Sequence, residues 1–330
     1  MDEPRNGIKG GPYVVGIGAA NLDIMGRSRE TVVMEDSNPG FVGVSVGGVT
    51  HNICENAARL GAAVKFISVT GDDFRGRTIR EACRDAGLDI SHFMTVPGHA
   101  SSTYLSIHDR DGEMTVALSD MRVLQRLTVE FLEERREVLE GAAAIVMDCG
   151  LPQEVLDHVA RAYGDRVPVF VDPVSTAYAR KLLGELRGFH TIKPNRLEAQ
   201  VLAGMEISSQ ASLEEACRRI LARGARRVVV SLGREGVFAM EEGGAAHRMP
   251  AFPLEEVVNA TGAGDCFMGA LVFAHVSGMA PEEALAFATC ASALALSHRA
   301  TINPHITQRA VLAVLDRFPY YTDRKGSNER

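Results

Sequence analysis

Short apolar segments that alternate with helix-like segments run through most of this 330-residue chain. Two of these apolar segments, at 64–69 and 143–149, are each followed by a turn and a helix-like stretch, and two more lie at 13–18 and 167–172. A strand–helix–strand order of this kind predicts a parallel sheet with helices on both faces. We therefore expect an α/β fold with a central, mainly parallel sheet flanked by helices.

Two segments interrupt this order with strand-like sequence only. Residues 25–47 contain β-prone pieces at 31–34 and 40–46, and residues 101–120 contain a further pair around an Asp-Gly turn. Both patterns predict hairpins. We expect the hairpins to form a small sheet that acts as a lid over a site, and to join two copies as a homodimer. Asp120 ends the second hairpin, where it either touches a ligand or is an ordinary loop residue.

The sequence indicates one domain over residues 12–320, with flexible tails at 1–11 and 322–330. The net charge of −7 gives no general attraction for nucleic acid or anionic lipid. The six cysteines show no metal-binding spacing, which is typical of free thiols in a reducing compartment. No apolar stretch reaches the ~20 residues that span a bilayer. We therefore expect a cytoplasmic protein without membrane or nucleic-acid partners.

The sequence Thr261-Gly262-Ala263-Gly264-Asp265 leads directly into a long apolar helix. The first N–H groups of a helix form an anion site. A carboxylate beside such a site can take a proton from a hydroxyl while the N–H groups hold a transferring phosphoryl group. The alternative is that Asp265 only caps the helix.

A second group of candidate residues lies near the amino terminus. Asn21 and Asp23 follow the first predicted strand at its carboxyl end, where ligands bind parallel sheets, although both residue types also favour turns. Gly47 and Gly48 lead into a helix and would let a ligand approach the backbone. Asn52 offers an amide in the first turn of that helix.

Two later turns are candidates for nucleotide and metal binding. A short strand ends at Lys193 and a helix begins near Asn195, which shares one face with Glu198. An amide and a carboxylate in this arrangement can hold water around Mg²⁺, or they form only a capping box. Gly233 and Gly236 follow a strong β run and indicate a turn that admits a flat or phosphorylated ligand.

The G-G-x-x-x-N helix at 47–52, the P-N-x-x-E turn at 194–198 and the T-G-A-G-D-x-F turn at 261–267 occur in this order. Together they resemble the ribokinase-like (PfkB) family of sugar and nucleoside kinases. The resemblance implies an ATP-dependent kinase in which Asp265 is the general base, and in which Ala263 and Gly264, after Gly262, form the anion hole. ATP and Mg²⁺ are the implied cofactors, and K⁺ is a further candidate.

The resemblance also assigns the other candidate residues. The acceptor would be held by Asn21, Asp23, Gly47, Gly48, Asn52 and Asp120. The nucleotide would be lined by Lys193, Asn195, Ser231, Gly233, Gly236, Thr261, Gly262 and Gly264. Asn195 and Glu198 would order water around Mg²⁺, and Asn259 with Thr261 would mark the K⁺ position.

A narrower resemblance links the chain to members of this family that phosphorylate the 5′-hydroxyl of pseudouridine. It includes the segments 36–40, 119–121 and 172–175. His51 and Gly150 stand where that subgroup predicts arginine and asparagine. A kinase of ribose or of another nucleoside, and a catalytically silent nucleoside-binding sensor, remain alternatives. A dinucleotide dehydrogenase is disfavoured because no G-x-G-x-x-G follows the first strand.

Overall fold

The structure is a computed structural model that describes residues 11–318 and 320. Apart from Gly11, the tails predicted at 1–11 and 322–330 lie outside the described residues. No helix in the described part of the chain combines the length and apolar character needed to span a membrane.

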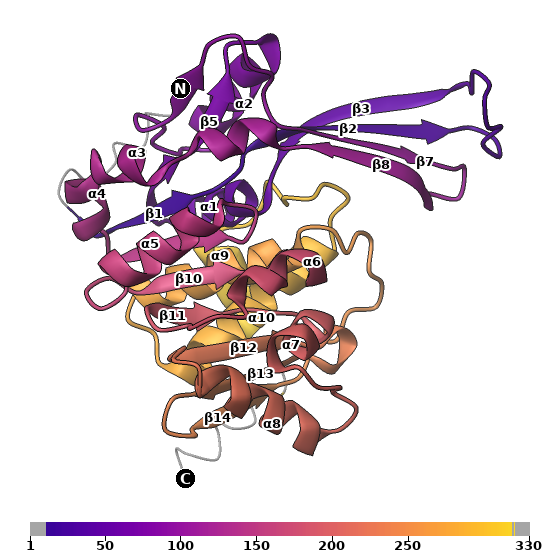
Figure 1. Cartoon of the computed structure of the whole chain (residues 1–330). Coiled ribbons are helices and arrows are strands. Elements are labelled where there is room, and N and C mark those ends of the chain that lie inside the picture. Colours follow the sequence, from indigo (N-terminus) through magenta and orange to yellow (C-terminus); the bar gives the residue numbers. More distant parts are fainter. Residues whose placement is uncertain (1–10, 319, 321–330) are drawn as a thin grey trace.

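The framework is a sheet of eight strands (Figure 1). Its strands are β1 (Tyr13–Ile17), β4 (Ala63–Ile67), β9 (Ala144–Asp148), β10 (Val169–Asp172), β11 (Phe189–Ile192), β12 (Arg227–Ser231), β13 (Val237–Glu241) and β14 (Ala246–Met249). The spatial order is β14-β13-β12-β11-β10-β9-β1-β4. The six neighbouring strands β12, β11, β10, β9, β1 and β4 are parallel, and β13 and β14 add an antiparallel edge. The predicted central, mainly parallel sheet is confirmed.

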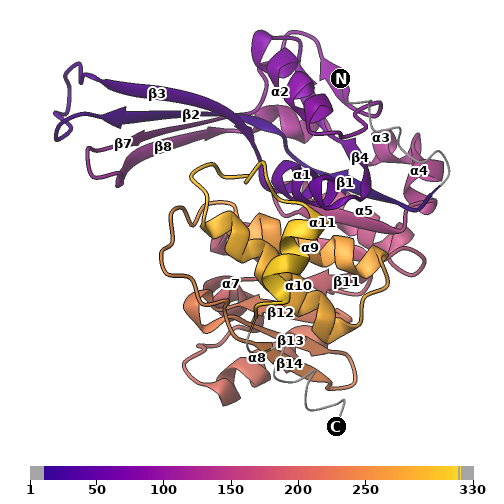
Figure 2. The same cartoon turned by 180° about the vertical axis from the view of Figure 1, so that it is seen from behind.

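Helices cover both faces of this sheet because successive strand residues point to opposite sides. Val15 and Ile17 pack with the helices seen at the front of Figure 1, whereas Val14 packs with those at the front of Figure 2. The first layer holds α3 (Val129–Glu133), α4 (Arg136–Glu140), α5 (Gln153–Tyr163), α6 (Thr176–Ala179), α7 (Arg196–Ala203) and α8 (Gln210–Leu221). The second holds α1 (Val49–Leu60), α2 (Phe74–Asp85), α9 (Ala263–Val276), α10 (Pro281–Leu296) and α11 (Gln308–Leu315). A separate parallel pair is formed by β5 (Val69–Gly71) and β6 (Met94–Val96).

A second sheet of four strands projects from one end of the body (Figures 1 and 2). Its strands are β2 (Asn21–Ser28), β3 (Gly40–Gly47), β7 (Thr103–His108) and β8 (Met114–Asp120), in the order β3-β2-β7-β8. The separate small sheet predicted from the two insertions is therefore present. We call it the lid.

The first hairpin of the lid differs from the prediction. Its outgoing strand is residues 21–28, paired in register with 40–47, and the piece at 31–34 lies in the connecting loop. The β-prone side chains at 31–34 misled the prediction because β2 is fixed by its parallel pairing with β7, a contact that local sequence does not reveal. Asn21 and Asp23 consequently lie on a lid strand rather than in a turn.

The two faces of the lid have different chemistry. Cross-strand pairing places on one face Ile24, Val42, Val44, Leu105, Ile107, Val116 and Leu118. The opposite face carries, next to the body of the protein, the row Ser45, Asp23, Tyr104 and Ser119. Hereafter these are the apolar face and the polar row.

The close approach of α1 to α9 depends on Gly269. A side-chain carbon at this position would lie 2.6 Å from the backbone oxygen of Ile53 and 2.9 Å from Cβ of Asn56. The absence of a side chain therefore lets the two helices pack backbone to backbone.

We expect Gly269→Ala to destabilise the fold. Alanine improves helix propensity by about 1 kcal/mol, but the clash with Ile53 should outweigh this gain and lower the free energy of unfolding by about 1–3 kcal/mol. Urea denaturation measures the change. Gly184→Ala is the control, because a side chain there meets no atom within 4 Å. Equal or higher stability of Gly269→Ala would contradict the packing argument.

Candidate active site

Charged side chains gather where the central strands end. Asp148 ends β9, Asp172 ends β10, and Lys193 follows β11 directly. The carboxyl ends of neighbouring parallel strands lie at one edge of a sheet, which is where α/β proteins bind ligands. Asp265, at the start of α9, is coupled electrostatically to all three residues.

Asp265 is held in place by the glycine turn and by α1. Gly262 caps α9 with a φ of 79°, and a side chain there would lie 2.4 Å from the backbone oxygen of Thr301, so only glycine fits. The Asn52 amide Nδ2 donates a hydrogen bond of 2.8 Å to Asp265 Oδ2. The expectation that Asp265 and Asn52 belong to one site agrees with this contact.

A single buried cation lies beside this carboxylate. Lys193 Nζ pairs with Asp172 Oδ2 at 3.0 Å, and both side chains are buried. A side chain added at Gly264 would begin 3.5 Å from Lys193 Nζ, so the ammonium lies next to the first turn of α9. Burial opposes the charge, but the attraction of Asp172, Asp265 and Glu198 outweighs it and raises the pKa of Lys193.

The surroundings of Asp265 favour its protonated form. Burial and the negative charge of Asp172 raise the pKa of this carboxyl to about 7, while the Asn52 hydrogen bond and Lys193 oppose the rise. A group with a pKa near 7 can accept and release a proton at neutral pH. The carboxylate is therefore suited to general-base chemistry.

Sequence reasoning missed Asp148. Its carboxylate accepts hydrogen bonds from the Thr50 hydroxyl at 2.5 Å and the Thr50 backbone at 3.2 Å, and from the Gly150 backbone at 2.7 Å. These bonds tie the first turn of α1 to the end of β9. The signal was available, since an aspartate that ends a predicted strand is placed at the site edge.

The candidate acceptor residues lie together at the base of the lid. Asn21 donates from Nδ2 to Asp23 Oδ1, and β2 pairs Asn21 with Gly47. Side chains at Gly47 and Gly48 would clash with Asp23 and Asn21 respectively. Burial raises the pKa of Asp23 to about 6.

Asp120 does not face this group. Pairing of Leu22 with Thr103, and of Thr103 with Asp120, places Asp120 on the apolar face of the lid, opposite Asp23. Its carboxylate is bound by Arg122 through bonds of 2.8 and 2.7 Å, and this contact lowers its pKa to about 2. The neighbouring Ser119 lies in the polar row instead, so the register of β8 does not favour the assignment of Asp120 to the acceptor.

Asn195 and Glu198 form the capping box that the sequence left as an alternative. Glu198 accepts from the Asn195 backbone and side chain at 2.8 Å each, and the Glu198 backbone donates to Asn195 Oδ1 at 2.9 Å. Burial raises the pKa of Glu198. Residues 11–318 contain no cluster of three or more His, Cys, Asp or Glu arranged to hold a metal ion. The Mg²⁺ assignment stays a prediction.

The remaining nucleotide candidates lie on two turns. Ser231 forms an isolated bridge to Asn195, which joins the turn at Gly233 and Gly236 to the capping box. Asn259 donates to the backbone oxygen of Arg299 at 2.9 Å and accepts from the Thr261 N–H at 2.9 Å. The K⁺ assignment to Asn259 and Thr261 stays a prediction.

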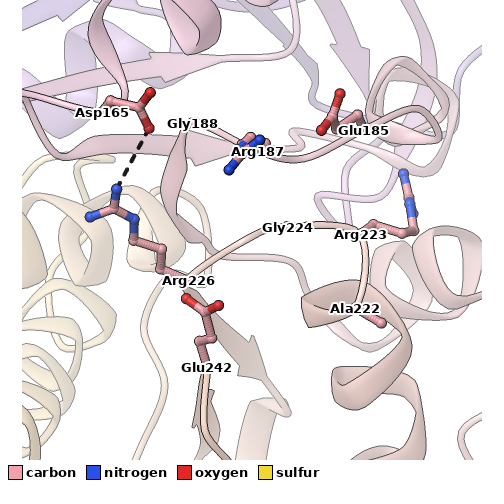
Figure 3. Close-up of a pocket in the computed structure, with 9 residues that line it drawn as sticks. All are labelled: Asp165, Glu185, Arg187, Gly188, Ala222, Arg223, Gly224, Arg226 and Glu242. Carbon is pink, nitrogen blue, oxygen red and sulfur yellow. Dashed lines mark ion pairs between the residues drawn. The ribbon is translucent and has the colours of Figure 1, made fainter.

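A surface pocket of about 540 Å³ lies at the opposite end of the sheet (Figure 3). Gly188 and Arg226, which line it, directly precede β11 and β12. Arg226 pairs with Asp165 at 3.9 Å, and Arg223 donates to backbone oxygens that include that of Leu202. The charges of Asp165, Arg223 and Arg226 are thus engaged with each other or with the backbone, and the pocket lies away from the strand ends that carry the site.

A lidded α/β sheet with a glycine-capped helix beside a carboxylate is the architecture of ribokinase-like phosphotransferases. Residues 12–308 match the pfkB family of carbohydrate kinases. The chain belongs to this family and is a phosphotransferase with an alcohol acceptor.

Individual relatives agree with this placement. The chain is 37% identical over 309 residues to the pseudouridine kinase of Escherichia coli K12, covering 92% of this chain and 96% of that protein. It is 34% identical over 323 residues to the uncharacterized sugar kinase YeiI of the same strain, covering 96% and 89%. The ribokinase of Arabidopsis thaliana, solved with ribose and ATP, shares the fold with a TM-score of 0.81 at 23% identity, covering 92% of this chain and 98% of that one.

The raised pKa of Asp265 predicts a pH-dependent cost to stability. The folded chain holds this proton up to about pH 7, whereas an unfolded aspartate loses it near pH 4. Stability from this group is therefore complete below about pH 4 and is lost as the pH rises through about 7. Asp265→Asn should exceed wild type in free energy of unfolding at pH 8 by about 1–3 kcal/mol, and by much less at pH 5.

Urea denaturation of both proteins at the two pH values tests this expectation. Asp120→Asn is a matched control, because the pKa of that carboxyl is lowered to about 2 and its replacement should not stabilise the fold at pH 8. A gain for Asp265→Asn that is the same at pH 5 and pH 8 would show that titration of Asp265 is not its source.

Proposed function

We propose that the protein uses ATP to phosphorylate the 5′-hydroxyl of pseudouridine, with Asp265 as the general base. The observation that carries the proposal is the contact of Asp265 with Asn52 beside the start of α9. It places a carboxylate with a pKa of about 7 next to N–H groups that have no helical partners. Taking a proton and stabilising a transferring phosphoryl group are then tasks of adjacent groups.

The reaction follows from the roles of these residues. Asn21, Asp23 and Asn52 hold the ribose hydroxyls beneath the lid, and the polar row covers the base. Asp265 accepts the 5′-hydroxyl proton as the oxygen attacks the γ-phosphorus of ATP, and the bond from that phosphorus to the β–γ bridging oxygen breaks to release ADP. The N–H groups of Ala263 and Gly264, together with the Lys193 ammonium, stabilise the charge on the phosphoryl oxygens. Closure of the lid keeps water from acting as the acceptor.

The nucleotide and metal assignments belong to the same proposal. Ser231, Gly233 and Gly236 would line ATP, and Asn195 with Glu198 would hold water around Mg²⁺. Three carboxyl groups, those of Asp172, Glu198 and Asp265, interact electrostatically with the ammonium group of Lys193. This excess of acidic groups favours a divalent cation there. A hydrated ion that takes most ligands from water and phosphate needs no preformed cage of protein ligands. The proposal also includes K⁺, bound at Asn259 and Thr261, as an activator of the enzyme.

The narrower sequence resemblance favours pseudouridine as the acceptor, and two observations support this choice. The similarity to the pseudouridine kinase covers 92% of the chain. Tyr104 and Ser119 extend the polar row beyond Asp23, which provides an aromatic ring and a hydroxyl where a base attached to the ribose would lie. A kinase of ribose or of another nucleoside is the alternative within the family. A catalytically silent sensor is disfavoured because Asp265 keeps its partner Asn52.

An assay of ADP formation with separate acceptors tests the proposal. With ATP and Mg²⁺ we expect strong preference for pseudouridine over uridine and ribose, and phosphate on the 5′ oxygen by NMR. Asp265→Asn should lower kcat by a factor on the order of 10² or more, with little change in acceptor binding.

The outcomes separate the two parts of the proposal. Preference for ribose or uridine would keep the base and reject the acceptor. Wild-type turnover of Asp265→Asn would reject the base.

We further propose that the apolar face of the lid joins two copies of the chain in a cytoplasmic homodimer. Val42 and Leu118 on this face are 74% and 66% exposed, and the face is continuous across all four strands. A patch of this kind on a projecting sheet favours burial against a partner. A second copy supplies a matching face through a two-fold axis. The six buried free cysteines are compatible with a reducing cytoplasm.

Leu118→Lys should convert the dimer to a monomer, because it places a charge within the apolar face, opposite Leu105 of β7. Sedimentation equilibrium measures the mass directly. Met25→Lys is the matched control: Met25 is 49% exposed on the opposite face of the lid, and its substitution should leave the dimer intact. A wild-type monomer, or dissociation by both variants alike, would contradict the proposal.

A further inference from the structure

His51 is buried directly beside the site, yet the reaction described above gives it no task. Its side chain is 1% exposed. Nδ1 lies 3.2 Å from Asn52 Oδ1, and Nε2 has no hydrogen-bond partner among the described residues. A buried polar atom without a partner costs free energy, so its retention at this position needs an explanation.

The amide of Asn52 can be oriented in two ways, and only one suits Asp265. With Nδ2 toward Asp265 the amide donates to the carboxylate at 2.8 Å. With the amide turned over, Oδ1 would face Asp265 and two acceptors would oppose each other. Because Nδ2 faces Asp265, Oδ1 faces His51, and the Nδ1–H group of His51 is the donor that satisfies it.

We infer that His51 is a positioning residue that fixes the Asn52 amide and, through it, the orientation and basicity of Asp265. The inference rests on the proposed role of Asp265 as general base. His51 does not touch the reacting atoms.

The other side of the His51 ring is compatible with this role. Glu55 Oε2 lies 3.5 Å from Nε2, which is too long for a good hydrogen bond. Glu55 Oε1 instead accepts from Arg59 Nε and Nη2 at 2.8 and 2.7 Å. Burial lowers the pKa of His51 and the nearby Glu55 charge opposes that change. A neutral ring with its proton on Nδ1 leaves Nε2 without a proton, which agrees with the lack of a hydrogen-bond partner for Nε2 among the described residues.

The remaining contacts hold the segment rigid around this bond. Asp148 binds Thr50, and Asn56 Nδ2 donates to the backbone oxygen of Asn52 at 2.7 Å. The Asn52 amide can thus still rotate while these contacts hold the rest of the first turn of α1, and His51 restricts that rotation. The other charges that act on Asp265 come from the strand ends, namely Asp172, Lys193 and Asp148.

Two substitutions separate positioning from packing. Asn at position 51 can place an amide N–H where His51 carries Nδ1, whereas Gln places its amide near the Nε2 position. His51→Gln should therefore lower kcat on the order of five- to tenfold with KM for both substrates within about twofold. His51→Asn should stay within about threefold of wild type.

The pH profile provides a readout that packing would not move. The Asn52 bond lowers the pKa of Asp265, so its loss raises that pKa and keeps the base protonated to higher pH. The acid limb of the kcat profile should shift upward by about half a unit to one unit in His51→Gln, and not in His51→Asn. In an Asn52→Ala background, His51→Gln should have no further effect on the limb.

The measurements are made on the full-length enzyme with ATP, Mg²⁺ and its best acceptor. A shift of the acid limb in His51→Gln that is absent from His51→Asn and from the Asn52→Ala background supports the inference. Equal effects of the two His51 variants, an unmoved limb, or additive effects with Asn52→Ala would overturn it. Full turnover of Asp265→Asn would instead reject the base assignment itself.

Discussion

The hydrogen bond between Asn52 and Asp265 joins residues that are 213 positions apart, and the site depends on the helix contact that permits it. Gly269 lets α9 pack against the backbone of α1. Gly262 begins α9 in a left-handed conformation, and Asp148 ties the start of α1 to the sheet through Thr50. The carboxylate is therefore oriented by three separate elements, whose positions are set by close backbone packing at the two glycines and by the buried Thr50–Asp148 hydrogen bond.

The same packing concentrates negative charge. Asp172, Glu198 and Asp265 all act electrostatically on Lys193, the buried cation of this group. Repulsion from Asp172 and Asp148 adds to the effect of burial in raising the pKa of Asp265 to about 7. Such repulsion costs stability, as functional sites often do. A divalent cation would bring compensating positive charge, so the repulsion in the free site favours the metal ion that the proposed reaction needs.

Local sequence predicted the α/β framework because strand and helix periods are short-range signals. It also located the turns at Gly262 and Asn195, which begin α9 and α7, while the roles assigned to these turns stay predictions. It failed where pairing between distant segments decides the structure. The register of β2 with β7 moved the first lid strand to residues 21–28. The same register turned Asp120 away and put Ser119 beside Tyr104. The Asn52–Asp265 contact and the support of His51 likewise depend on tertiary packing, which no local pattern encodes.

The alternation of the lid strands has an evolutionary consequence. Side chains repeat every two residues along a strand, so inserting one residue near Asp23 would exchange the polar row with the apolar face over the rest of that strand. Near the body, the lid can therefore change in length only by pairs of residues. The register irregularity at Ile107 and His108 lies toward the far end of β7, where single-residue length changes leave the polar row in place.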